Sequence, residues 1–510
     1  MSELSNKSEQ IIRALQDRIH TIDWESSALE TGRVDSVGDG IVFVEGLRNV
    51  LANELVRFKD NTFGMAMNLE EDQVGVVLLG SDHNIRENDV VYRTEEIVRV
   101  GVGDELLGRI VDPLGRPMDG GSEFQPAEYY EIERPAPAIM ARKSVYKPLF
   151  TGIKLIESII PIGKGQRELI IGDQQTGKTS IALNTILNQK GQNVKCVYVA
   201  IGQKSSTVSR LVSQLKQYGA LDYTVIVNSP ADDSAALQYI APYAGCSIAE
   251  YWMERGEDTL IIYDDLSKHA VAYRTISLLL RRPSGREAYP GDVFYLHSRL
   301  LERAAQMNDE HGGGSLTALP IIETQQGDIS AYIPTNVISI TDGQIFLDTN
   351  SFNSGRRPAI DSGLSVSRVG SDAQTKAMKE VSKSLKIELT SYAELQSFAQ
   401  FDTDVDEDTK RIIEHGKRLT ELMKQPQIDV KPHEYTILSV FLNRTDWLDQ
   451  LEINEVVPFE SYMHKRFSDD YPEILAELAK DYVLTEELTH KIHAALQDIY
   501  NDFKELLPNG

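Results

Sequence analysis

Residues 172–179 read Gly172-Asp173-Gln174-Gln175-Thr176-Gly177-Lys178-Thr179, directly after a predicted strand at residues 168–171. A helical pattern beginning at Ser180 follows this loop. The order of strand, glycine-rich loop and helix is that of a phosphate-binding P-loop, in which backbone N–H groups and the positive end of the helix surround phosphate oxygens. The motif predicts that Lys178 contacts the β- and γ-phosphates of a nucleotide and that the hydroxyl of Thr179 holds Mg²⁺.

Apolar, β-rich runs alternate with helical stretches on both sides of this loop, from about residue 168 to residue 347. Strands that are buried on both faces and separated by helices are typical of a parallel α/β sheet. The predicted strands are residues 169–171, 194–201, 223–227, 260–263, 317–322 and 337–340. The expected fold class is therefore an α/β P-loop core of the RecA-like type.

Other patterns flank this core. Short runs at residues 33–37, 41–44, 55–58, 64–69 and 75–79, separated by turn residues, predict a small N-terminal β-barrel. The chain after Gly370 has a helical pattern, and residues 408–424 place Ile412, Leu419 and Met423 on one side of a helix. Apolar residues at positions 11, 12, 15, 19 and 22 predict an amphipathic helix that packs on its own domain or docks on a partner. The expected domains are the N-terminal helix 1–25, the barrel 26–94, the P-loop domain 95–372 and the C-terminal helical domain 373–510.

Composition argues against several classes of protein. The sequence has no apolar run of bilayer-spanning length, and its first nine residues are polar, so we expect neither export nor a transmembrane span. The 77 Asp and Glu residues outnumber the 52 Lys and Arg residues, and the formal charge of -25 disfavours nucleic-acid binding. Cys196 and Cys246 lie in apolar segments, which indicates buried thiols and neither a disulfide framework nor a metal site.

Two other strand ends point to the phosphate site. The apolar run at residues 260–263 ends in Asp264 and Asp265, and an acid in this position suits an aspartate that reaches Mg²⁺ through water. The run at residues 194–201 is followed by Gly202 and Gln203. Glutamine can orient a water molecule but cannot accept a proton as glutamate does, so Gln203 weakens the case for hydrolysis at this site.

Several stretches closely resemble the alpha subunits of F-type ATP synthases, and the resemblance covers nearly the whole chain. They are residues 165–173, 198–204, 261–268 and the signature Pro358-Ala359-Ile360-Asp361-Ser362-Gly363-Leu364-Ser365-Val366-Ser367-Arg368-Val369-Gly370. The resemblance implies a subunit that binds ATP or ADP with Mg²⁺ without hydrolysing it, because Gln203 occupies the position of the beta subunit's catalytic glutamate. It also implies that Arg368 is an arginine finger for the γ-phosphate held by a beta subunit, a task that suits a planar guanidinium. The residues implied to surround the adenine are Phe352, Arg357, Pro358, Gln425 and Gln427.

The same resemblance implies partners and a location. The partners are beta subunits in an alternating hexamer, a central-stalk gamma subunit, a peripheral-stalk delta subunit contacted by the N-terminal helix and, indirectly, a membrane sector. The implied location is the cytoplasmic face of a bacterial cell membrane, or the equivalent face of an organelle membrane, with peripheral attachment.

Two alternatives and one departure from the family pattern remain. An autonomous hexameric ATPase would need a glutamate in place of Gln203. An RNA-translocating ring of the Rho type is disfavoured by the acidic charge and by the missing basic, aromatic RNA platform. Gln174 stands where the family usually has arginine, which removes one positive contact to the nucleotide. His269, near the start of a helix, is expected on the protein surface rather than in acid–base chemistry.

Overall fold

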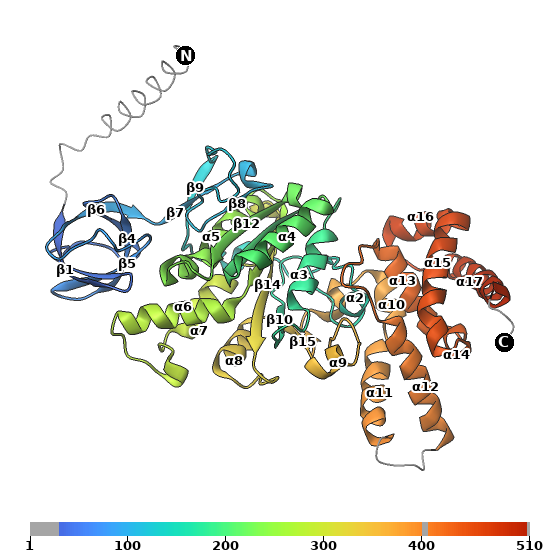
Figure 1. The fold of residues 1–510 in the computed structure, drawn as a ribbon. Coiled ribbons are helices and arrows are strands. Elements are labelled where there is room, and N and C mark those ends of the chain that lie inside the picture. The colour runs from blue at the N-terminus through green and yellow to red at the C-terminus, as the bar shows by residue number, and fades with distance from the viewer. Residues whose placement is uncertain (1–29, 400–405, 507–510) are drawn as a thin grey trace, which may run out of the picture. The chain divides into compact units, whose positions relative to one another are not determined.

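The computed structural model describes residues 30–399 and 406–506 (Figure 1). Of these, residues 30–98 form one compact unit and residues 99–506 belong to a second. The helix predicted over residues 1–25 lies outside the described residues. Of the helices in the described ranges, none is long and apolar enough to cross a bilayer.

The first unit is a closed barrel of six antiparallel strands, in the order β1-β2-β5-β4-β3-β6. The strands are β1 Thr31–Gly38, β2 Ile41–Glu45, β3 Glu54–Phe58, β4 Phe63–Leu69, β5 Gln73–Leu78 and β6 Val90–Ile97. The barrel prediction is confirmed, although the sequence pattern missed β6. That strand carries Arg93 into the fold, where its Nε lies 2.7 Å from Oε1 of the fully buried Glu54. The ion pair lets a polar segment close the barrel.

An eight-stranded sheet forms the centre of the second unit, in the order β16-β15-β10-β14-β13-β11-β12-β8. All neighbouring strands are parallel except β16, which runs antiparallel to β15 at one edge. This confirms the predicted α/β core. The strands are β8 Ile110–Val111, β10 Leu169–Asp173, β11 Val194–Gln203, β12 Thr224–Pro230, β13 Asp258–Asp264, β14 Ser315–Thr324, β15 Gly343–Leu347 and β16 Val366–Ser367.

Helices between these strands cover the sheet (Figure 1). They include α3 Lys178–Leu187, α4 Ser205–Gln217, α5 Ala235–Met253, α6 Leu266–Leu279, α7 Val293–Leu301 and α8 Tyr332–Ile340. The strand predicted at residues 337–340 is wrong, because these residues end α8. Ile333, Val337 and Ile340 are buried at helical spacing, and the strand follows at β15. A mostly apolar run of four residues fits both the helical period and the strand period. A run this short therefore cannot distinguish a helix from a strand.

The C-terminal part is helical, as predicted. Its main helices are α10 Lys376–Val381, α11 Leu385–Ala399, α12 Glu407–Leu422, α13 His433–Phe441, α14 Trp447–Gln450, α15 Val456–Asp470, α16 Pro472–Asp481 and α17 Glu486–Leu506. In α12 the prediction of one apolar side is wrong for Ile412, which is 44% exposed, whereas Leu419 is fully buried. The buried residues of α12, Gly416, Leu419 and Leu422, all lie in its C-terminal half, and the helix contacts α11, α14 and α15.

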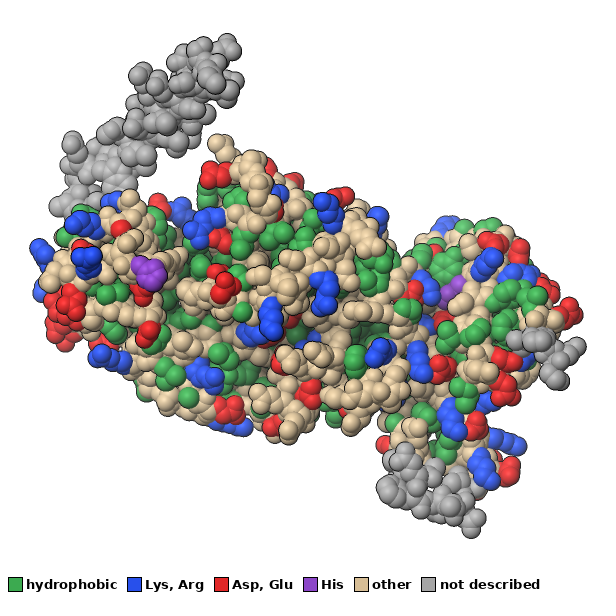
Figure 2. Space-filling view, in the orientation of Figure 1, with side chains coloured by type: hydrophobic (Ala, Val, Ile, Leu, Met, Phe, Trp, Pro, Cys, Tyr) green, Lys and Arg blue, Asp and Glu red, His purple; other side chains and the backbone are tan. Residues whose placement is uncertain are grey.

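Both cysteines, Cys196 and Cys246, are free and buried as expected. Acidic and basic side chains are interspersed over the face drawn in Figure 2, where no continuous basic stripe gathers.

Candidate nucleotide-binding site

The loop between β10 and α3 has the backbone form that a phosphate cradle needs. Gln175 and Gly177 have φ angles of +64° and +104°, so the chain turns twice through the left-handed region. A Cβ on Gly172 would lie 2.8 Å from the carbonyl oxygen of Leu347, which leaves room only for glycine. Since α3 starts directly after Gly177, the positive end of the helix faces the loop.

Lys178 lies against this loop. Its Nζ donates to the carbonyl oxygens of Gly172 at 2.8 Å and Asp173 at 2.5 Å. Burial lowers the pKa of Lys178, while four acids, Glu323, Asp265, Asp264 and Asp173, act in the opposite direction. A cation held by two carbonyl oxygens can exchange these ligands for phosphate oxygens.

The loop aspartate anchors the cradle to the rest of the sheet. Asp173 Oδ1 accepts hydrogen bonds from Thr324 Oγ1 at 2.6 Å and Gly327 N at 2.8 Å. Its Oδ2 accepts one from Thr349 Oγ1 at 3.0 Å. Burial raises the pKa of Asp173, but these hydrogen bonds outweigh burial and leave the pKa below its usual value. Asp173 therefore ties the loop to the segments after β14 and β15, whereas Gln174 is exposed.

Three predicted residues meet at one carboxylate. Thr179 Oγ1 donates to Asp264 Oδ2 at 3.0 Å, and Gln203 Nε2 donates to Asp264 Oδ1 at 2.9 Å. The fully buried hydroxyl of Tyr198 also donates to Asp264 Oδ2, and burial raises the pKa of this phenol well above its usual value. Sequence reasoning missed Tyr198, although its polar tip stands out in the aliphatic strand β11. Hydroxyl and carboxylate oxygens on adjacent elements are ligands that suit Mg²⁺, directly or through water.

Asp265, the acid next to Asp264, caps a helix. Asp265 starts α6, and its Oδ1 accepts the backbone N–H of Lys268 at 2.7 Å. Burial raises the pKa of Asp265 to about 6.

The expectation of a surface His269 is wrong: this residue is fully buried, with Nε2 3.0 Å from the carbonyl oxygen of Tyr239. Helix α6 packs closely on α5, which encloses its first turn.

The residues expected around adenine come from two segments near the start of α3. The Arg357 guanidinium lies over the Phe352 ring, 4.4 Å from its centroid. Gln427 Nε2 donates to Ser180 Oγ at 2.9 Å. The backbone N–H of Gln425 donates to the carbonyl oxygen of Arg357, next to Pro358, at 2.9 Å. The structure thus gathers all five residues beside the P-loop helix.

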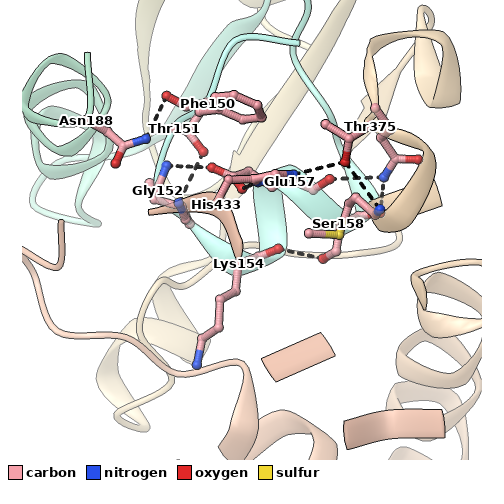
Figure 3. Close-up of polar contacts among 12 residues, drawn as sticks. Phe150, Thr151, Gly152, Lys154, Glu157, Ser158, Asn188, Thr375 and His433 are labelled. Carbon is pink, nitrogen blue, oxygen red and sulfur yellow. Dashed lines mark hydrogen bonds and ion pairs between the residues drawn. The ribbon is translucent and has the colours of Figure 1, made fainter. Parts of the chain in front are cut away.

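Gln425 also enters a polar junction between the P-loop domain and the C-terminal helices. Its side chain accepts from Lys154 N at 2.7 Å and donates to the carbonyl oxygen of Gly152 at 2.9 Å, at the start of α2 Lys154–Ile159. In Figure 3, Glu157 accepts from Gly152 N at 2.7 Å and bonds His433 Nδ1 at 2.6 Å. The segment that carries Gln425 is thereby connected to α2 and, through Glu157 and His433, to the C-terminal helices.

Arg368 lies near the amino ends of the parallel strands, whereas the P-loop lies at their carboxyl ends. Ser367 pairs with Gly343 at the amino end of β15, whereas the P-loop follows the carboxyl end of β10. The two ends of these strands are five residues apart, which corresponds to roughly 16 Å at about 3.3 Å per residue. The Arg368 side chain is exposed, reaches the Ile338 carbonyl oxygen at 3.5 Å, and forms no salt bridge with any residue in the ranges 30–399 and 406–506.

Family models match three parts of the chain. Residues 29–95 match the beta-barrel domain of the ATP synthase alpha/beta family, residues 152–367 match its nucleotide-binding domain, and residues 374–499 match the C-terminal domain of the alpha/beta chain. Two similar proteins are both named ATP synthase subunit alpha and come from the Kyoto and Loch Maree strains of Clostridium botulinum. Each is 53% identical to this chain over 497 residues, which cover 98% of this chain and 99% of the relative.

Proposed function

Because this chain belongs to the ATP synthase alpha/beta family, as an F-type alpha subunit, we propose that it binds Mg-ATP or Mg-ADP without hydrolysing it and supplies an arginine to a neighbouring beta subunit. The family match makes it a nucleotide-binding subunit of the ATP synthase complex. What we propose beyond this is that the chain's own site only binds nucleotide and that hydrolysis takes place at the neighbouring subunit's site.

The nucleotide would be held by the loop Gly172, Asp173, Gln174, Gln175, Thr176, Gly177, Lys178 and Thr179, with the adenine beside Phe352, Arg357, Pro358, Gln425 and Gln427. The donor set beside the loop fits Mg²⁺, because the Thr179 hydroxyl lies 3.0 Å from the Asp264 carboxylate. A bound Mg²⁺ would neutralise charge on the β- and γ-phosphates. Gln174 contributes no charge, so the nucleotide relies on Lys178 and the helix end for positive potential.

The absence of hydrolysis is inferred from the group that faces Asp264. The Gln203 amide donates to Asp264 Oδ1 at 2.9 Å and has no basic atom with which to deprotonate a water molecule. Asp265, the next acid, already accepts the N–H of Lys268 at 2.7 Å as a helix cap. We therefore expect stable nucleotide binding with no turnover at this site.

The observation that carries the proposal is the position of Arg368. An exposed guanidinium roughly 16 Å along the strand direction from its own P-loop is too far away to contact a phosphate bound there. A γ-phosphate on an adjoining subunit is the fitting target, since a planar guanidinium neutralises charge spread over phosphoryl oxygens.

The proposed setting follows the same family. Beta subunits would alternate with this chain in a hexamer around a gamma subunit, and residues 1–25 would contact a delta subunit. The complex would sit peripherally on the cytoplasmic face of a bacterial membrane, or on the equivalent face of an organelle membrane. The proposed domain limits are 26–94, 95–372 and 373–510.

Turnover of the assembled complex with beta and gamma subunits tests the role of Arg368. Arg368→Ala should lower kcat by about a thousandfold and leave KM nearly unchanged, because the contact strengthens in the transition state. Arg411→Ala, a change at an exposed arginine on α12, is the matched control and should keep the parental kcat. A parental kcat in Arg368→Ala would reject the proposal.

The isolated chain tests the second part of the proposal. It should bind Mg-ATP in calorimetric titration and release no phosphate over many hours, and Lys178→Ala should abolish the binding. Sustained hydrolysis by the isolated chain would show that its own site is catalytic.

A further inference from the structure

A buried carboxyl lies behind the backbone that carries Arg368. Glu168 is fully buried at the start of β10. Its Oε2 accepts from Gln166 Nε2 at 2.8 Å, and the same Nε2 donates to Ser367 Oγ at 3.1 Å. Ser367 immediately precedes Arg368, so two hydrogen bonds connect the carboxyl to the residue next to the arginine.

The carboxyl also packs on the strand pair itself. A Cβ on Gly343 would lie 2.5 Å from Glu168 Oε2 and 2.2 Å from the carbonyl oxygen of Val366. Glu168 therefore occupies the space that Gly343 leaves open, where β15 pairs with β16. A change in the shape or charge of this carboxyl acts directly on the two residues that lead into Arg368.

The adjacent residue fixes the arginine's backbone from the other side. The Arg167 guanidinium bonds both oxygens of Asp342, at 3.0 and 2.8 Å, and the Asp342 carbonyl oxygen accepts the backbone N–H of Arg368 at 2.7 Å. Residues 166–168 thus hold the segment 366–368 by hydrogen bonds on two sides. These hydrogen bonds hold the backbone of Arg368, whereas its guanidinium is exposed.

One oxygen of the Glu168 carboxyl lacks a hydrogen-bond partner among the described residues. Its Oε1 is buried and has no hydrogen-bond partner among residues 30–399 and 406–506. An ionised carboxylate in such a place is costly. Burial raises the pKa of Glu168 well above its usual value, and the Asp342 charge raises it further, whereas the Gln166 hydrogen bond and the Arg368 charge lower it. The surroundings of Glu168 therefore favour the protonated, uncharged carboxyl.

We propose that Glu168 is a positioning residue for Arg368: through Gln166, Ser367 and the Gly343 backbone, its carboxyl sets the place from which the guanidinium reaches a neighbouring subunit. This inference rests on the proposed role of Arg368. The charged groups that face Glu168 are Asp342 from the segment before β15 and Arg368 from the segment after β16. A negative charge on Glu168 would attract the Arg368 guanidinium toward the sheet, whereas the uncharged carboxyl leaves it free to reach outward.

The test measures kcat and KM in the assembled complex. Glu168→Ala should lower kcat about tenfold with little change in KM, since a shift of about 1 Å at a catalytic group costs this much or more. Glu168→Gln keeps the shape of the side chain and an oxygen that can accept from Gln166, so it should retain kcat. The control is Thr259→Val on β13, a buried hydroxyl without a hydrogen-bond partner among the same described residues, which should leave turnover unchanged.

A double-variant cycle separates this inference from the proposal on which it rests. If Glu168 acts through Arg368, the variant combining Glu168→Ala and Arg368→Ala should be no slower than Arg368→Ala alone. Parental kcat in Arg368→Ala would overturn the proposed function itself. A slow Arg368→Ala complex together with parental kcat in an assembled Glu168→Ala complex, or with a Glu168→Gln complex as slow as Glu168→Ala, would overturn the role of Glu168 alone.

Discussion

A buried ion pair joins the P-loop domain to the C-terminal helices. Lys154 Nζ on α2 lies 2.6 Å from Glu460 Oε1 on α15 and donates to the carbonyl oxygen of Leu422 at 2.5 Å. The two side chains are only 4% and 6% exposed. Ser439 Oγ donates to the same Glu460 oxygen at 2.5 Å. Both charges are thus desolvated and satisfied by each other and by nearby polar groups.

The expected cost of breaking this pair follows from that burial. Removing one partner of a buried ion pair costs about 3–5 kcal/mol because the other charge stays desolvated, whereas replacing both by apolar groups is about neutral. Lys154→Met should therefore destabilise the packing of α13 and α15 by about 3 kcal/mol or more, which raises their opening at least about a hundredfold. The double variant Lys154→Met with Glu460→Met should recover most of that loss.

Native-state hydrogen exchange measures this effect locally, with the amides of α5 as an internal reference. The control is Lys491→Met, which removes two exposed ion pairs, with Glu477 at 3.0 Å and Glu487 at 2.9 Å from Lys491 Nζ, and should leave exchange in α13 and α15 near the parental rate. The reasoning is refuted if Lys154→Met exchanges like the control, or if the double variant opens as readily as Lys154→Met.

Two further predictions concern α12. The carboxylates of Glu388, 3.9 Å from Nε2, and of Asp449, hydrogen-bonded to Nδ1 at 2.7 Å, outweigh burial and raise the pKa of His415 to about 9. Because this folded-state pKa lies above the unfolded value of about 6.5, the stabilisation is complete below about pH 6.5 and is lost as pH rises through 9, so exchange protection of α12 should fall over that window in the parent and not in His415→Asn. Gly416→Ala should destabilise the contact between α11 and α12 by about 1–3 kcal/mol, since the new Cβ would lie 2.3 Å from the Tyr392 ring; an unchanged melting temperature would contradict this close packing.

Much of the fold could be predicted from the sequence because its signals are local. Apolar runs marked five of the six barrel strands and most strands of the central sheet, and the P-loop fixed the order of strand and helix. The failures lie where a tertiary contact decides. Arg93 gives β6 a polar pattern that only its buried partner Glu54 explains, and residues 337–340 belong to α8 because the helix buries Ile333 and Val337 at the same time.

The site was predictable to the extent that parallel strands bring their carboxyl ends to one edge of a sheet. That rule placed Asp264 and Gln203 beside the P-loop. It could not identify Tyr198, which lies opposite Ile262 in the strand register and reaches Asp264 with its hydroxyl. It could not find Glu168 either, because its environment is made by Gly343 and Val366, far away in the sequence.

The two proposed functions of the chain are connected through a single strand. Residues 166–168 at the amino end of β10 hold the Arg368 segment, and the P-loop begins at its carboxyl end. Strand β10 is hydrogen-bonded to β14 on one side and to β15 on the other, so it cannot shift without these neighbours. If the proposed roles hold, a nucleotide that stays bound at the P-loop and the Arg368 segment contact opposite ends of the same strand, so retention of the nucleotide would favour a fixed position of the arginine.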